Sequence, residues 1–303
     1  MTILDRISLA TAKATRKKLI PFLPMAKKKK LDTARWLRGI EDRARLDMSD
    51  AAIVSYEKSG RTWLRVMLSR YYQLQYGLPS DRLLNFDRLH RINPAVPVVF
   101  FTHDRGVGRN AIHWERKSRA DPIPFILLVR DPRDVAVSYY FQWLYRMSDA
   151  ERWVNDLPVG DISIFDFMMR KNVGLLAVIH FMNRWYGNLS RMPNLRLFRY
   201  EDLRADAVTE LAKILRLLGG EPDMGRVEEV VAYAEFEKMK KREQAGEVKD
   251  SRLAPGDPEN PDSYKARRAK IGGYRDYFSE EEVRQIDMML EDALHPGYGY
   301  GSG

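Results

Sequence analysis

The sequence contains 303 residues, of which 51 are Lys or Arg and 42 are Asp or Glu, so its formal net charge is +9. Hydrophobic residues make up 45% and aromatic residues 11%, which can fill a sizeable core and excludes a mainly disordered chain. Cysteine is absent, which excludes disulfides, thiolate nucleophiles and cysteine-ligated zinc or iron–sulfur sites. The sequence has neither an apolar run of about 18 residues nor the apolar core of a secretory signal, so we expect a cytoplasmic protein.

Most of the excess positive charge lies at the N-terminus. Residues 1–30 contain nine Lys or Arg and one acidic residue, and therefore carry +8 of the net charge. We expect residues 1–50 to form a basic N-terminal arm and residues 51–303 to form one folded domain, with no nucleic-acid partner. The arm could lie on anionic lipid head groups, which attract clustered Lys and Arg by about 1 kcal/mol each. Alternatively it is a solvated, partly disordered tail, because Pro21 and Pro24 interrupt a helix.

From residue 51 onward, short apolar runs alternate with stretches of helical periodicity. Strands are predicted at Ala51–Tyr56, Val96–Phe101, Phe125–Val129 and Leu195–Phe198. Helices are predicted from Thr62 to about Leu74, from an N-cap at Asp131 through Trp143, from Asp206 to Gly219, and from a capping box at Ser279 and Glu282 to about Leu294. The alternation indicates an α/β fold with a mostly parallel central sheet flanked by helices. Ligands of such sheets bind beyond the carboxyl ends of the strands.

The first strand is followed by a turn suited to anion binding. The turn reads Lys58-Ser59-Gly60-Arg61-Thr62 and leads into a helix, whose free N–H groups and positive dipole end attract anions. The lysine precedes the glycine and the loop is short, so the pattern is not a Walker A motif. From these residues alone, an ordinary strand–helix turn with an exposed lysine is an equally good interpretation.

The third predicted strand ends in a second cationic position. Arg130 follows this strand directly, where a guanidinium could bind a phosphate through two hydrogen bonds. Ser138 lies two turns into the next helix and could add a hydroxyl. Alternatively, Arg130 pairs with Asp131 or Asp134 and Ser138 only packs. Because a Walker B strand would end in a magnesium-binding Asp, the arginine favours an anion site without a metal.

Two segments together resemble a known family. Residues 56–64 are similar to the 5′-phosphosulfate loop of cytosolic-type sulfotransferases that use 3′-phosphoadenosine 5′-phosphosulfate (PAPS), and residues 130–140 are similar to their 3′-phosphate segment. The motifs occur in the family's order, and the resemblance extends over residues 51–294. It implies a P-loop-like phosphosulfate-binding turn, and transfer of a sulfuryl group from PAPS to a hydroxyl or amine acceptor without a metal.

The resemblance also assigns site residues. It implies that Lys58 and His103 are catalytic, since Thr102-His103 resembles the family's Thr-His pair. The implied nucleotide-binding residues are Ser59, Gly60, Arg61, Thr62, Trp63, Arg130, Ser138, Tyr200, Phe236, Arg267, Arg268 and Ala269. Trp63 and Phe236 would stack on adenine, and the arginines would distinguish a 3′-phosphate from ordinary adenine nucleotides.

Several positions depart from the family pattern. Glu57 replaces a usual proline, Arg61 a common threonine, Phe101 a lysine and Ala269 a glycine. The departures add one carboxylate and one cation near the turn and remove another cation beside His103. The segment 243–268 lacks an apolar periodicity, and we expect it to order over bound nucleotide.

Two other functions remain open from the sequence. One is a nucleotide-dependent phosphotransferase on a similar scaffold, which magnesium-dependent ATP binding would support. The other is a non-catalytic protein that binds a membrane surface through residues 1–30. The acceptor is not readable and could be a small molecule, a carbohydrate or a lipid. Residues 142–171 could form its binding wall or part of the core, and the basic arm could make peripheral contact with the inner face of a membrane.

Overall fold

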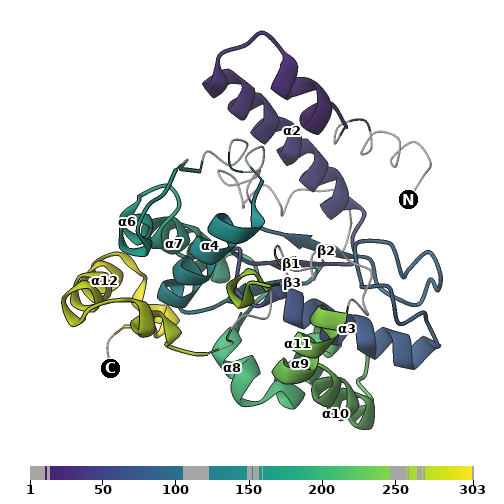
Figure 1. The fold of residues 1–303 in the computed structure, drawn as a ribbon. Helices are drawn as coiled ribbons and strands as arrows, with labels where there is room; N and C mark the ends of the chain where they lie inside the picture. The colour runs from purple at the N-terminus through teal and green to yellow at the C-terminus, as the bar shows by residue number, and fades with distance from the viewer. Residues whose placement is uncertain are drawn as a thin grey trace.

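A parallel sheet forms the centre of the protein. The computed structural model describes residues 11, 14–104, 123–148, 152, 157–158, 160–245, 257, 259–264, 268 and 270–301. Its four strands are β1 (Ala51–Val54), β2 (Val99–Thr102), β3 (Phe125–Val129) and β4 (Leu195–Arg199), in the spatial order β2-β1-β3-β4 (Figure 1). All three neighbouring pairs are parallel, which confirms the predicted sheet.

Each predicted strand is present, and one begins later than expected. β2 starts at Val99 rather than at Val96. Pro97 has no N–H to donate to a neighbouring strand, so the ladder begins beyond it. The carbonyl of Val96 instead accepts a hydrogen bond from Nδ1 of His90 at 2.8 Å, which gives His90 a packing role in the loop before the strand.

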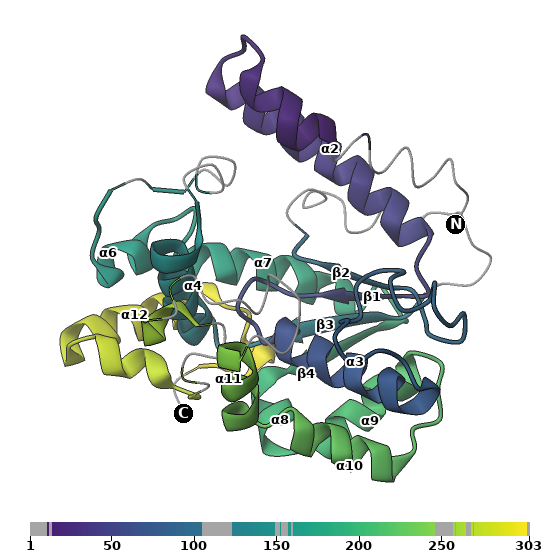
Figure 2. The same ribbon diagram turned by 45° about the vertical axis from the view of Figure 1, so that its right-hand side comes forward.

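Helices cover both faces of the sheet (Figure 1, Figure 2). The longer helices are α2 (Lys27–Asp47), α3 (Arg61–Tyr76), α4 (Pro132–Arg146), α7 (Leu175–Leu189), α9 (Ala207–Leu217), α10 (Met224–Tyr233), α11 (Phe236–Ala245) and α12 (Glu280–Ala293). Shorter ones are η1 (Thr15–Leu19), η2 (Ile20–Phe22), α6 (Ile164–Met169), α8 (Tyr200–Ala205), η4 (Pro261–Ser263), η5 (Gly273–Tyr277) and η6 (Pro296–Tyr298). The predicted helices are confirmed, including the N-caps at Asp131 and Asp206 and the capping box at Ser279.

The strands alternate between two cores. In β1, Ala52 and Val54 belong to the core that α4, α7 and α12 complete, whereas Ile53 belongs to the core of α3, α9 and α10. All four residues of β1 are buried. Because side chains occupy both faces of the sheet, its strand ends are where a ligand is expected.

The aromatic stretch considered as an acceptor wall contributes to a core. Trp143 and Phe167 are almost completely buried, and they form a small cluster with Tyr139, Leu157 and Val173. These five side chains are thus packing residues. Most of the segment 243–268, which we expect to order over bound nucleotide, lies outside the described residues.

The N-terminal segment contains a helix that the sequence did not predict. α2 has 21 residues and projects away from the sheet, and Pro21 and Pro24 precede it rather than interrupt it (Figure 2). The chain before it folds back onto the helix, where Arg16 forms a buried ion pair with Glu41 at 2.8 Å and Ile20 is buried. The helix was missed because its start lacks a side-chain cap and acidic residues, the usual local signals. Within the described part of the chain, no helix has the length and apolarity to cross a bilayer.

Candidate active site

Two connections leave neighbouring strands at the same edge of the sheet. β1 leads through residues 55–60 into α3, and β3 leads through Arg130 into α4. The two strands are paired in parallel, so their carboxyl ends lie side by side. Nη1 of Arg130 lies 3.5 Å from the carbonyl oxygen of Lys58. The structure thus brings together the two cationic strand ends that the sequence assigned to one site.

The turn after β1 has an unusual backbone. Lys58 and Gly60 both adopt left-handed conformations, with φ values of 70° and 92°. Gly60 is the N-cap of α3, and a Cβ atom there would lie 2.5 Å from Cδ2 of Tyr200. Glycine is therefore required both by the backbone angle and by the close approach of the ring. The first N–H groups of α3, which have no partner within the helix, begin at this turn.

Tyr200 supports the turn from the end of β4. Its ring is buried, with the guanidinium carbon of Arg130 4.7 Å from its centroid and the Trp63 ring 5.8 Å away, edge to face. Burial raises the pKa of Tyr200, so its phenol stays neutral. Nε1 of Trp63 donates a hydrogen bond to the carbonyl of Ala234 at 2.8 Å, two residues before Phe236 begins α11. Trp63 is thereby fixed close to the segment that carries the second predicted adenine-stacking residue.

A buried carboxylate, which the sequence analysis did not assign to the site, holds Arg130. Nη2 of Arg130 donates to Asp134 at 3.3 Å and to the carbonyl of Lys270 at 3.2 Å. Asp134 also accepts the backbone N–H groups of Gly272 and Tyr274, at 2.9 and 3.0 Å. Burial raises the pKa of Asp134, and the Arg130 guanidinium opposes that rise. The ion pair that the sequence left open therefore exists, between the last residue before the N-cap of α4 and the first turn of that helix.

The neighbouring acidic and basic residues are used elsewhere. Asp131 caps α4 and pairs with Arg133 at 2.7 Å, and Arg133 also reaches Asp287 of α12 at 2.6 Å. The backbone N–H of Asp131 donates to Glu201 at 2.9 Å, which joins the ends of β3 and β4. These contacts stabilise the end of β3. They use Asp131 and Arg133, so the carboxylate that pairs with Arg130 is that of Asp134.

His103 follows β2 and lies against the turn. Its Nδ1 is 2.9 Å from the carbonyl oxygen of Ser55, and its Nε2 is 2.5 Å from Nη2 of Arg61. Oε1 of Glu57 lies 3.7 Å from the same Nε2. The predicted catalytic histidine is thus adjacent to the turn, and two of the residues that depart from the family pattern contact or approach it. Another of the four departures, Phe101, packs beneath the guanidinium of Arg65 at 4.1 Å.

A second buried carboxylate anchors the histidine segment. Asp104 accepts a hydrogen bond from Nε1 of Trp185 at 3.1 Å and pairs with Arg184 at 3.3 Å, both from α7. Burial raises the pKa of Asp104 to about 6. Sequence reasoning could not find this residue, since its partner on α7 lies 81 positions along the chain. The contacts fix the backbone next to His103.

The remaining predicted site residues are spread around this edge or lie outside the described residues. Ser59 is buried in the turn, and Thr62 lies in the first turn of α3. Ser138 is half-buried on α4. Arg268 pairs with Asp276 at 2.7 Å and donates to the hydroxyl of Tyr277 at 3.0 Å. Arg267 and Ala269 lie outside the described residues.

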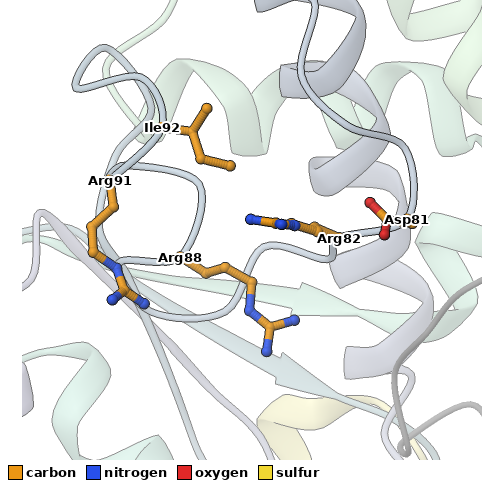
Figure 3. Close-up of a pocket in the computed structure, with 5 residues that line it drawn as sticks. All are labelled: Asp81, Arg82, Arg88, Arg91 and Ile92. Carbon is orange, nitrogen blue, oxygen red and sulfur yellow. The ribbon is translucent and has the colours of Figure 1, made fainter.

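A separate cavity, lined by none of these site residues, lies at the loop before β2 (Figure 3). It has a volume of about 530 Å³ and is lined by Asp81, Arg82, Arg88, Arg91 and Ile92. Phe86 of the same loop bridges Val99, the first residue of β2, which places this loop beside the amino end of that strand. In the part of the chain that the structure describes, no group of three or more acidic or histidine side chains could hold a metal ion.

The chain belongs to the sulfotransferase domain family, whose model matches residues 48–297. It is 25% identical over 263 residues to sulfotransferase 1B1 of Mus musculus, covering 81% of this chain and 82% of the relative. It is 23% identical over 275 residues to flavonol 3-sulfotransferase of Flaveria bidentis, with 81% and 82% covered. It is 23% identical over 271 residues to 3-alpha-hydroxysteroid sulfotransferase of Cavia porcellus, with 85% and 88% covered.

Solved structures share this fold. A mouse sulfotransferase, SULT7A1, complexed with PAP, has a TM-score of 0.54 and 19% identity, covering 84% of this chain and 89% of that chain. Retinol dehydratase in complex with androsterone and the inactive cofactor PAP has a TM-score of 0.53 and 18% identity, with 84% and 85% covered. The likeness supports the predicted architecture, and the family match agrees with the resemblance of the motifs.

Proposed function

We propose that the protein is a cytoplasmic sulfotransferase that moves a sulfuryl group from PAPS to a hydroxyl or amine of a small-molecule acceptor. The observation that carries the proposal is the meeting of the Lys58 turn, Arg130 and His103 at one edge of the sheet. Two structural neighbours are bound to PAP, which is the donor without its sulfuryl group. Relatives named for a flavonol and a hydroxysteroid support a small acceptor.

In the proposed reaction, the acceptor oxygen or nitrogen attacks sulfur in line with its bond to the 5′-phosphate. The new bond to sulfur forms as the bridging S–O bond breaks, and the electron pair of the broken bond stays on the phosphate oxygen. Lys58 and the first N–H groups of α3 stabilise the charge that develops there. The acceptor proton passes to Nε2 of His103. The products are the sulfated acceptor, PAP and one proton, which His103 later releases to water.

The rest of the site is proposed to bind the nucleotide. Ser59, Gly60, Arg61 and Thr62 would surround the 5′-phosphosulfate. Arg130 would bind the 3′-phosphate, because a guanidinium presents several hydrogen-bond donors to an anion. Trp63 and Phe236 would stack on adenine above Tyr200, and Ser138, Arg267, Arg268 and Ala269 would complete the 3′-phosphate pocket.

Thermal stabilisation by nucleotides tests this function. We expect PAP, which carries a 3′-phosphate, to raise the unfolding temperature much more than 5′-AMP does. A ligand at about 100 times its dissociation constant stabilises the folded state by about 2.7 kcal/mol. Equal shifts with PAP and 5′-AMP would contradict the 3′-phosphate pocket, and a larger shift with ATP and magnesium would support a phosphotransferase instead.

We also propose that the N-terminal helices contact an anionic membrane surface. Phe22 is 84% exposed and Trp36 65% exposed, and Leu19, close to Phe22 in sequence, is exposed as well. Lys28 and Lys29 are exposed at the start of α2, which projects from the sheet (Figure 2). Exposed apolar side chains next to lysines are the combination that binds the interface of an anionic bilayer.

Vesicle sedimentation tests the membrane contact. We expect the protein to pellet with vesicles that contain phosphatidylglycerol and to stay in solution with pure phosphatidylcholine at low salt. The double variant K28E/K29E should lose this binding, whereas K213E/R216E on α9, with the same change in charge, should keep it. Equal binding of both variants, or no binding of the unaltered protein, would contradict the proposal.

A further inference from the structure

The hydrogen bonds of His103 define its protonation. A carbonyl oxygen can only accept, so Nδ1 carries the proton that it donates to Ser55 at 2.9 Å. A guanidinium can only donate, so Nε2 uses its lone pair to accept from Arg61 at 2.5 Å. The imidazole in this arrangement is neutral. The nitrogen that would take the acceptor proton is therefore occupied by Arg61.

Glu57 is positioned to accept a hydrogen bond from His103 when Nε2 is protonated. Its Oε1 lies 3.7 Å from Nε2 of His103, and its side chain is buried. A carboxylate cannot donate to a neutral imidazole lone pair, so this contact is not a hydrogen bond while Arg61 is in place. Once Nε2 carries a proton, it becomes a donor and Glu57 becomes its acceptor. Arg61 is thus a partner for the neutral imidazole and Glu57 a partner for the protonated one, and a general base passes through both states.

From this geometry we propose that Arg61 covers the base of the resting enzyme and transfers its hydrogen bond to the sulfuryl group when PAPS binds. The inference rests on the proposed function and adds a named role for a residue at the first position of α3. Hydrogen bonds between two charged groups are stronger than those to a neutral nitrogen, so the anionic sulfuryl oxygens draw the guanidinium away from His103. Nε2 then becomes available to the proton of the acceptor substrate. After the proton has been transferred, Glu57 accepts a hydrogen bond from the protonated Nε2.

Binding measurements without any acceptor test the contact with the sulfuryl group. Dissociation constants of PAPS and of PAP are measured by calorimetry for the unaltered protein and for R61T. We expect R61T to weaken PAPS binding by about tenfold to a hundredfold more than PAP binding, because PAP lacks the sulfuryl group. R61K keeps the positive charge and should retain most of the affinity for PAPS. R70T removes another arginine of the same helix, which pairs with Glu229 of α10 at 3.5 Å, and as the matched control it should change neither constant.

Chemical modification tests whether Arg61 covers the histidine. Diethyl pyrocarbonate acylates unprotonated imidazole nitrogens, and mass spectrometry reports the rate at each histidine. We expect R61T to raise the rate at His103 several-fold in the absence of nucleotide, with the rate at the exposed His180 unchanged. R61A, which also removes the guanidinium, provides the same comparison if R61T is poorly folded.

The outcomes separate this inference from the proposed function. If the unaltered protein does not distinguish PAP from 5′-AMP, the proposed function fails. If it does, and R61T weakens PAPS and PAP equally, Arg61 binds the phosphate and the sulfuryl contact is wrong. An unchanged acylation rate at His103 in R61T and R61A would show that Arg61 does not cover the base.

Discussion

Replacing His103 with alanine is expected to lower kcat by about 10²–10⁴-fold, the usual contribution of a general base. The expectation follows from the position of Nε2 beside the Lys58 turn, where the acceptor proton would be received. Binding of PAP should persist, because the contacts of Arg130 and Trp63 that would hold the nucleotide do not involve this imidazole. Steady-state rates with PAPS and an acceptor that the unaltered protein sulfates, together with thermal shifts by PAP, measure the two effects.

A matched substitution isolates the role of the imidazole. His180 is an exposed histidine on α7, and H180A should leave kcat and PAP binding unchanged. A loss of less than tenfold in H103A would contradict general-base catalysis by this residue. Loss of PAP stabilisation in H103A would instead indicate that His103 supports the fold of the turn.

Replacing Gly60 with alanine is expected to destabilise the protein by about 2–3 kcal/mol and to abolish PAP stabilisation. A side chain in the left-handed region costs roughly 1 kcal/mol or more, and the new Cβ would lie 2.5 Å from the Tyr200 ring. Relief of this clash must move either the ring that supports Arg130 and Trp63 or the first N–H groups of α3. Denaturant unfolding and thermal shifts with PAP measure the two losses.

Gly77 separates the backbone cost from the clash. It ends the same helix with a φ of 62°, and no atom lies within 4 Å of an added Cβ. G77A should therefore lower the free energy of unfolding only by the cost of the left-handed backbone, about 1 kcal/mol, and should bind PAP normally. If G60A and G77A were equally stable and both bound PAP, the close packing of Tyr200 against the turn would not matter for the site.

The strands, most helices and the edge that carries the site followed from the sequence because the signals are local. An apolar run such as Phe125–Val129 and a cap such as Asp131 act within a few residues. The rule that ligands bind at the carboxyl ends of parallel strands then placed Lys58 and Arg130 together. The resemblance of Thr102-His103 to the family's Thr-His pair added the assignment of His103.

The partners of these residues could not be predicted, since they join distant parts of the chain. Arg61 and His103 are 42 residues apart, and their contact depends on side-chain conformations that no local pattern encodes. The ring of Tyr200 beneath Gly60 likewise required the position of β4 in the sheet. α2 escaped prediction for another reason, because lysines occupy its first turn, where the helix dipole disfavours positive charge.

The position of Asp134 has a thermodynamic consequence. One carboxylate is shared by Arg130 and by backbone groups of Gly272 and Tyr274, up to 140 residues away in sequence. An anion that draws Arg130 toward itself weakens that sharing, and reciprocity requires that any change in how the C-terminal segment is held alters the affinity for the anion. Substitutions that change how this segment is held are therefore expected to change the affinity for the anion without touching the reacting atoms.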